Sequence, residues 1–405
     1  MIALLAVLFL MRLTLIYQNY QTFISKPFYF TYAKVLYEIP KFKNGRAYKI
    51  LKLHSEEGLD FFTTAHQNVS YESKRLRLQI FPTDHISFGD YLGTFFVKSR
   101  IKEIQPLPLT FKDHLLKQIN VQHKDQGIAS FYRAIFFATP LDRKLREQVA
   151  KLGISHLVAL SGFHLTILWG MIYGALLLVY RPLQQRFFPY RFTLIDLGSV
   201  AIVLLALYLW FVNFPPSLVR SYVMVLFGWV IMVLGIELIS FEFLATVTGI
   251  LLLLSPGLSV SLGFWFSIAG VYSIFLLLKY TKALDAKVVK YVMIPFGIFI
   301  LMQPVVHGYF GTTTSYQLLS PFLSLAFILF YPSAILMHLT GYGAFFDGEL
   351  SWLFHLPKES AEHLLPLWML DVYIFSALLA IFSKKAFLLM LMFAIGYITY
   401  LFFIR

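Results

Sequence analysis

GISHLVALSGFHLTILWGMIYGALLLVY, residues 153–180, is the stretch that decides the fold, because it joins a polar turn to a long apolar run. His156, Ser161, Gly162 and His164 all stand in its first half. If a single helix runs through this stretch into a bilayer, His164 lies about nine residues inside it, roughly 13 Å deep at the rise of an α-helix. Ionisable side chains at that depth are usually functional.

The composition of the whole chain predicts a membrane protein. Of its 405 residues, 58% are hydrophobic and only 14% are charged, and the mean hydropathy is +0.70. That leaves too little polar surface for a soluble protein of this length. Apolar segments with the length of transmembrane helices occur at residues 1–17, 155–180, 193–212, 217–235, 243–256, 261–278, 291–306, 318–339, 365–381 and 386–404.

Several classes of chemistry are excluded by absent residues. The sequence has no cysteine, which excludes disulfides, thiolate metal sites and cysteine nucleophiles. It has no GxxxxGK[ST] loop, so it does not hydrolyse nucleotide through a P-loop. We predict no cofactor and no metal site. The first apolar segment lacks a basic start and a small-residue cleavage site, so it is predicted to be an uncleaved anchor.

Charge divides the chain. Residues 18–110 carry 13 Lys/Arg against 8 Asp/Glu, and residues 111–152 carry 8 against 4, so this third holds +9 of the net charge of +13. A basic soluble domain is therefore attached to a nearly neutral membrane domain. The predicted boundaries are an anchor at 1–17, a basic β domain at 18–106, an amphipathic helical connector at 107–152 and the membrane domain at 153–405.

The basic domain has the pattern of short strands. Apolar residues alternate in FYFTYAKVLYEI, RAYKILKL, RLRLQIF and DYLGTFFVKSRIKEI, with turn residues between them. Five or so strands in about 80 residues suit a small β-barrel such as the OB-fold, which binds oligonucleotides. FKDHLLKQI and LDRKLREQVAKL instead have helical periodicity. The predicted fold class is a polytopic α-helical membrane protein of about 8–10 transmembrane helices with a small OB-like barrel near the N-terminus.

Positive charges in short loops predict the orientation. If the spans alternate, two basic loops fall on one side, which is then cytoplasmic, and the basic β domain is extracytoplasmic. One loop, with Lys384 and Lys385, disagrees under strict alternation. The two agreeing loops contain Arg181, Arg186, Arg191, Lys279, Lys282, Lys287 and Lys290.

The run GISHLVALSGFHL, with FYRAIFFATPLDRKLREQVAKL before it, resembles the competence domain of the ComEC/Rec2 family, the membrane channel proteins of natural DNA uptake. The similarity continues in WFVNFPPSLVRSYVMVL, in LLLLSPGLSVSLGFWFSIAGV and in HGYFGTTTSYQLLSPFLSLAFILFYP. The four blocks cover most of residues 130–332. The residues that carry the resemblance in the second and third blocks are Pro216, Arg220, Gly263, Phe264 and Ser267.

The sequence also departs from the family pattern. Trp265 and Phe266 stand where a glutamine and a leucine are usual, and Ser320 followed by Pro321 stands where a small polar Asn is common. Many members end in a metallo-β-lactamase-like nuclease domain, whereas this sequence has no HxHxDH run. We therefore expect a short form without a nuclease of its own.

The resemblance implies a function. It predicts a multi-pass channel of the bacterial inner membrane, not an enzyme, that imports single-stranded DNA in natural transformation. The implied partners are single-stranded DNA, membrane lipid, separate DNA receptor or pilus components, an ATPase or helicase, and a nuclease, with a homo-oligomer as one possible assembly. The rival hypotheses are a transporter of another anionic polymer or solute and an intramembrane Ser/His hydrolase.

A DNA strand needs cations for its phosphates and flat rings for its bases. The basic domain interleaves both, and the residues predicted to bind DNA are Lys34, Lys41, Lys43, Arg46 and Lys49. The alternative is that the aromatic rings are core and the lysines only a solvated face.

The polar residues of the first block allow several interpretations. His156, Ser161, Gly162 and His164 line or brace a channel, or simply pack. Alternatively Ser161 and His164 are a nucleophile and its base, or the two histidines bind a metal. Arg220 either extends to lipid headgroups or, as the resemblance implies, has a structural or phosphate-facing role.

Overall fold

The computed structural model describes residues 2–43, 46–66, 69–71, 74–108, 110–233, 240–357 and 359–404. The chain divides into two compact units. The first unit is Met1–His114 with Ala245–Leu262, and the second is Leu115–Leu244 with Gly263–Arg405. Most of the four-block region therefore belongs to the second unit, and each unit is described by itself.

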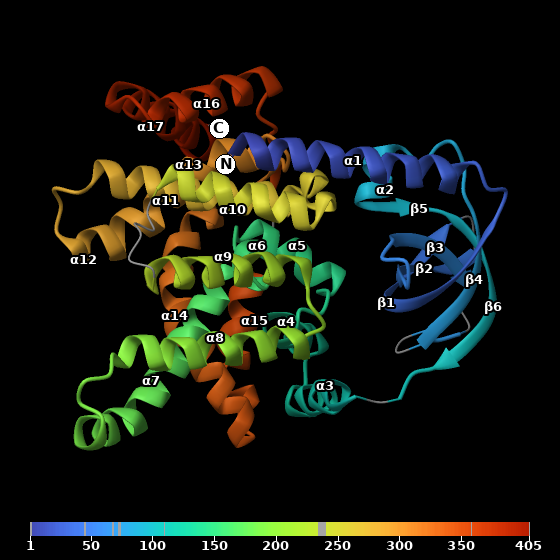
Figure 1. The fold of residues 1–405 in the computed structure, drawn as a ribbon, viewed down its shortest axis with the longest axis horizontal. Coiled ribbons are helices and arrows are strands. Elements are labelled where there is room, and N and C mark those ends of the chain that lie inside the picture. Colours follow the sequence, from blue (N-terminus) through green and yellow to red (C-terminus); the bar gives the residue numbers. More distant parts are fainter. Residues whose placement is uncertain are drawn as a thin grey trace. The chain divides into compact units, whose positions relative to one another are not determined.

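The first unit combines a long helix with a six-stranded sheet (Figure 1). Arg12 of the long helix donates a hydrogen bond to the carbonyl oxygen of Leu253, which explains why residues 245–262 group with the N-terminal segment. The elements are α1 (Ile2–Ile24), β1 (Tyr29–Lys43), β2 (Arg46–Ser55), β3 (Asp60–His66), β4 (Lys74–Phe81), α2 (Phe88–Leu92), β5 (Thr94–Phe96), β6 (Lys98–Pro106), the end of α10 (Phe241–Leu254) and η1 (Pro256–Val260).

The sheet has the strand order β5-β3-β2-β1-β4-β6. Its pairs are antiparallel except β3 with β5. Alternation along the strands places one set of side chains in a core, where Ala33, Leu53 and Leu76 are almost fully buried. The intervening residues face outward, as expected for a strand with one buried face. The predicted basic β domain is thus built on a real sheet.

The sheet does not close into a barrel. β5 pairs with only three residues of β3, and after Val97 the chain leaves β3 and pairs with β4 as β6. Within the described residues no ladder joins β5 to β6, so these two strands remain edges. The hydroxyl oxygens of Thr63 and Ser99 are nevertheless 2.7 Å apart, because the sheet curves strongly. The prediction of a closed, OB-like barrel is therefore wrong.

The second unit is helical. Its elements are α3 (Phe111–Gln122, which starts in the first unit), α4 (Gln126–Phe137), α5 (Arg143–Lys151), α6 (Ser155–Val158), α7 (Gly162–Phe187), α8 (Thr193–Phe211), α9 (Pro216–Val233), the start of α10, α11 (Leu262–Tyr280), α12 (Ala286–Val288), η2 (Val289–Met293), α13 (Ile294–His307), β7 (Thr312–Thr313), η3 (Ser315–Leu319), α14 (Ser320–Thr340), η4 (Gly343–Phe346), α15 (Asp347–His355), β8 (Ala361–Glu362), α16 (Leu367–Ala380), α17 (Lys384–Thr399) and η5 (Tyr400–Ile404).

Seven helical segments among the described residues are long and apolar enough to cross a membrane. They are Ala3–Ile24, Gly162–Phe187, Thr193–Phe211, Leu262–Tyr280, Ala286–His307, Ser315–Leu339 and Lys384–Phe403, and shorter apolar helices occupy Leu218–Val233, Phe241–Leu254 and Leu367–Ala380. Every apolar segment predicted from the sequence overlaps one of these helices. The chain is a multi-pass helical membrane protein.

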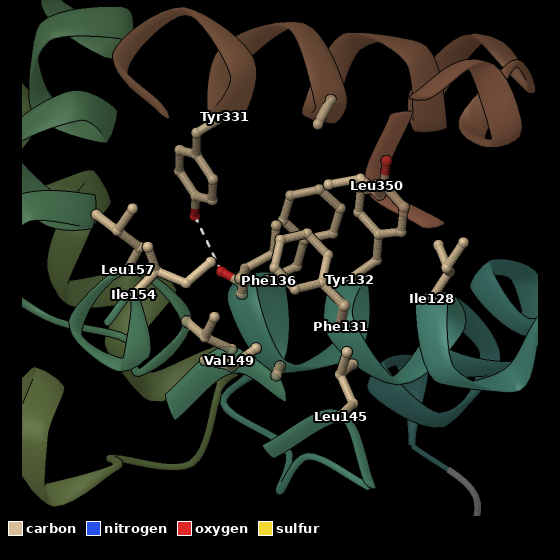
Figure 2. Close-up of a cluster of buried hydrophobic side chains, with 14 of the residues drawn as sticks. Ile128, Phe131, Tyr132, Phe136, Leu145, Val149, Ile154, Leu157, Tyr331 and Leu350 are labelled. Atoms are coloured by element: carbon tan, nitrogen blue, oxygen red, sulfur yellow. Dashed lines mark hydrogen bonds between the residues drawn. The ribbon is translucent and has the colours of Figure 1, made fainter. Parts of the chain in front are cut away.

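Helix α4 lies at the centre of the largest core cluster of the second unit. The Asp125 carboxylate accepts a hydrogen bond from the Gly127 N–H and caps its start. Figure 2 shows Tyr331 of α14 pointing at α4, where its hydroxyl donates to the carbonyl oxygen of Ile135 at 3.3 Å. Nine residues of α4 are buried. α3 and α5 lie where amphipathic helices were predicted, but the buried α4 between them was missed.

Helices α8 and α9 meet at Gly198, which gives a test of the packing. A Cβ atom on Gly198 would overlap the Trp229 ring, whereas one on Gly174 of α7 would meet nothing within 4 Å. Gly198→Ala should therefore lower the free energy of unfolding in detergent by about 1–3 kcal/mol. Gly174→Ala should be neutral or stabilising by up to about 1 kcal/mol, because alanine favours helix. Equal effects of the two substitutions would contradict this packing.

Candidate functional site

The polar turn of the first block breaks the helix. α6 ends at Val158, Ser161 has extended backbone, and α7 begins at Gly162. His164 is therefore the third residue of α7, so the expectation of one helix with His164 nine residues inside it is wrong. We call Gly153–His164 the α6–α7 turn.

His164 is fully buried although it lies near a helix start. Its ring packs edge-on against Phe327 and Tyr331 of α14, with centroid distances of 5.1 and 5.0 Å. The backbone N–H of Ser161 donates to Nδ1 at 3.3 Å, so in the neutral ring Nε2 carries the proton. That Nε2 has no hydrogen-bond partner among the described residues. His164 thus braces α7 against α14.

This geometry does not favour a nucleophile and base. Ser161 Oγ is 3.4 Å from His164 Nδ1, which is long for a catalytic pair, and the Ser161 N–H already occupies that nitrogen. A base also needs a third group to orient it. In the part of the chain that the structure describes, no such group contacts Nε2 of His164.

Polar side chains near the start of α14 hold the beginning of the turn. Ser320 donates to the carbonyl oxygen of Gly153 at 3.0 Å. Nε2 of His156 lies 3.2 Å from Ser324 Oγ. Gly153 has φ +69°, and a Cβ there would come within 3.2 Å of Gln317, so both backbone and space require glycine. The carbonyl oxygen of Gly153, in the turn between α5 and α6, is thus bonded inside the protein.

The second and third blocks meet the turn through α9. Gly162 of α7 approaches Ser221, whose Oγ would lie 3.5 Å from a Cβ on the glycine. The neighbouring Arg220 is 7% exposed, and its Cζ lies 5.9 Å from the ring centroid of Phe264 in α11. Nε of Arg220 has no hydrogen-bond partner among the described residues. Arg220 therefore packs inside the unit and does not extend to its surface.

The remaining predicted residues of these blocks do not join the cluster by any described contact. Gly263 is exposed in the first turn of α11, and Ser267 is half-buried one turn later. Pro216 is the first residue of α9, but its side chain lies outside what the structure describes. The structure thus brings together Gly162, His164, Arg220 and Phe264 on adjoining helices.

The first unit presents arginines and aromatic rings on the outer face of its sheet. Tyr32 and Arg77 are directly opposed across β1 and β4, as are Lys34 and Arg75. Arg75 lies 4.5 Å from the centroid of Tyr32, and Arg77 lies 5.9 Å from the centroids of Tyr32 and Phe30. Phe30 is 48% exposed. We call these five residues the basic aromatic face.

The lysines and the arginine predicted to bind DNA differ in their surroundings. Lys34 and Lys41 are exposed on β1. Lys49 is largely buried, with Nζ 2.7 Å from Glu38 Oε1 and 3.0 Å from the Val69 carbonyl oxygen, so it is held within the sheet. Lys43 and Arg46 belong to β1 and β2, but their side chains lie outside the described set.

Two groups of residues escaped sequence reasoning. Arg75 and Arg77 alternate with leucines in RLRLQIF, which indicates that both arginines lie on one outward face of a strand. Only the strand pairing in the structure shows that β1 lies opposite them. Gln317 and Ser320 lie in a block that carried no predicted site residue, and their bonding partners are about 167 residues away in sequence. Nothing local in the sequence names those partners.

The sequence model of a family described as Competence protein matches residues 138–404, well over half of the chain. The match includes the α6–α7 turn, Arg220, Phe264 and α14, whereas the sheet lies outside it. The chain therefore belongs to the competence protein family.

The chain is also similar to an uncharacterized protein of Aquifex aeolicus (strain VF5), with 27% identity over 267 residues. The similar region covers 61% of this chain and 60% of the relative, so the chain spans about 60% of the length of the curated relative it matches. No solved structure matches the chain.

The packing of His164 predicts a large stability effect. His164→Ala should remove the ring held between α7 and α14 and lower the free energy of unfolding of the purified full chain by about 2–4 kcal/mol. His355→Ala is the matched control, because His355 is exposed on α15 and should change stability by less than about 0.5 kcal/mol. If both variants unfold like the unmodified protein, His164 does not brace the two helices.

Proposed function

We propose that this protein is a channel that passes single-stranded DNA across the cytoplasmic membrane of a bacterium during natural transformation. The observation that carries the proposal is the basic aromatic face, which belongs to a chain with a multi-pass helical unit of the competence family. In this proposal the sheet lies outside the cytoplasm and receives the strand, and the helical unit conducts it.

The face has the two properties that a single strand requires. Lys34, Arg75 and Arg77 offer positive charge to phosphates, although Glu56 is bonded to Arg75 and offsets part of it. Phe30 and Tyr32 offer rings on which bases of any sequence can stack. The ring of Phe30 is half-exposed to water. A base stacked on it would remove this apolar surface from water, which is favourable.

The aromatic rings favour DNA over another anionic polymer. A transporter of polyphosphate or of an acidic polysaccharide would use the same cations, but it would gain little from stacking. Competition between single-stranded DNA and polyphosphate for the full chain therefore separates the two hypotheses, since DNA should bind more tightly at equal charge.

In the helical unit, the α6–α7 turn positions the helices, and Arg220 contributes a buried cation to the path of the strand. The protein acts in this proposal as a conduit and not as an enzyme. Force and strand degradation come from separate proteins: a DNA receptor or pilus, an ATPase or helicase, and a nuclease. A homo-oligomer would be compatible with this role.

Substitutions on the face should separate phosphate contacts from base contacts. Arg77→Ala should weaken binding of short single strands by the full chain and reduce the slope of log affinity against log salt by about 0.7–1. Phe30→Ala should weaken binding by about 1–3 kcal/mol while leaving the salt slope unchanged. Arg143→Ala, at an exposed arginine of α5 outside the face, is the control. Binding that does not weaken as salt rises would refute a phosphate-binding face.

Delivery of DNA into cells tests the proposed function itself. A strain that lacks this chain should collect labelled DNA at its surface but fail to bring it into the cytoplasm, and Ser161→Ala should restore most delivery because Ser161 has only a positioning role. Normal cytoplasmic delivery without the chain would overturn the channel proposal. Complete loss of delivery in a correctly folded Ser161→Ala protein would instead support the hydrolase.

A further inference from the structure

Three side chains from three segments of the chain form a hydrogen-bonded series in the second unit. His123 lies between α3 and α4, His338 in the last turn of α14, and Asp347 at the start of α15. Nδ1 of His123 is 2.9 Å from Asp347 Oδ1, and its Nε2 is 2.9 Å from Nε2 of His338. Nδ1 of His338 is 2.7 Å from the Ala334 carbonyl oxygen. The His123 side chain is 0% exposed.

These contacts fix the number of protons on the two rings. Carboxylate and carbonyl oxygens only accept hydrogen bonds, so Nδ1 of each histidine must carry a proton. A neutral imidazole has only one N–H. Two neutral rings would therefore turn two lone pairs toward each other at 2.9 Å. One additional proton between the two Nε2 atoms removes this conflict and gives the pair a single positive charge, which Asp347 balances.

Aromatic rings enclose the pair, so the nearby anion must offset the cost of burying its charge. Tyr132 of α4 stacks on His123 at a centroid distance of 4.6 Å and lies 4.4 Å from His338, and Phe136 covers His338 edge-on. Burial raises the pKa of Tyr132, with smaller contributions from Asp347 and Glu349, so its phenol stays neutral. The carboxylate of Asp347 is thus the anion that contacts the pair, and Glu349 of the same helix adds negative potential.

A proton fits this site better than a metal ion does. Metal sites generally need at least three protein ligands, and among the described residues no group of three or more His, Cys, Asp or Glu side chains could hold a metal. Asp347 contacts the far side of His123 and does not reach the gap between the two Nε2 atoms.

We propose that His123 and His338 form a proton-binding site in which one shared proton locks the end of α14 to the segment before α4 and, through Asp347, to α15. As pH rises and the proton leaves, the contact between the two Nε2 atoms is lost. α14 also carries Phe327 and Tyr331, which pack against His164. Proton binding therefore acts on the helix that braces the α6–α7 turn, whether or not the protein conducts DNA.

Nitrogen NMR of the full chain, labelled with ¹⁵N-histidine in lipid nanodiscs, tests the site. His123 and His338 should titrate in one coupled step, as expected for two groups that share a proton. Asp347→Asn should move this step to lower pH by about 1–3 units, because the removed carboxylate stabilises the charged form. His338→Gln should abolish the coupled step at His123. His355→Gln, on α15 outside the cluster, should leave the step unchanged.

Three results would overturn the proposal. One is independent titration of the two histidines, with His123 unchanged in His338→Gln. Another is an unshifted step in Asp347→Asn. The third is one tightly bound metal ion per chain that is lost in both His123→Gln and His338→Gln, with ring signals that do not respond to pH. If His338→Gln does not fold, the shift in Asp347→Asn decides.

Discussion

Backbone oxygens freed by a broken helix need partners inside the protein, because hydrocarbon supplies none. In the second unit this requirement falls on the turn before α6. Ser320 at the start of α14 bonds the carbonyl oxygen of Gly153, and Phe327 and Tyr331 farther along α14 enclose His164. His338 lies in the last turn of the same helix. His156 and His164, two of the residues that carry the family resemblance, are therefore ordered by one helix, and a change at either end of α14 acts on them.

In the proposed function, the two units divide the work that moving a strand requires. The first unit supplies an outward surface where Arg77 and Phe30 lie side by side, suited to a chain of phosphates and bases. The second supplies apolar helices, and among its described residues Arg220 is a buried side chain with a full charge, which is costly to bury. The proposed function accounts for this residue at the junction of α9 and α11, because its positive charge would attract a passing anion.

Hydropathy predicted the helical segments well, because twenty apolar residues have few alternatives in a membrane. It could not place His164, since LVALSG is equally apolar whether the helix continues or breaks at Ser161. The buried α4 escaped because its 12 residues are too few to cross a membrane, so hydropathy did not single it out. Closure of the sheet was predicted wrongly because the strand pattern does not reveal that β5 pairs over only three residues. The pairing of His123 with His338 depends on tertiary contacts that no local pattern encodes.

The central claim is that a DNA strand runs from the basic aromatic face into the helical unit. The most direct measurement is a map of crosslinks from a strand trapped in transit, using a photoreactive group on the DNA and mass spectrometry of the full chain. The account predicts crosslinks both at the face around Phe30 and Arg77 and in the second unit around Arg220. Crosslinks confined to the sheet, with none in the helical unit, would contradict it.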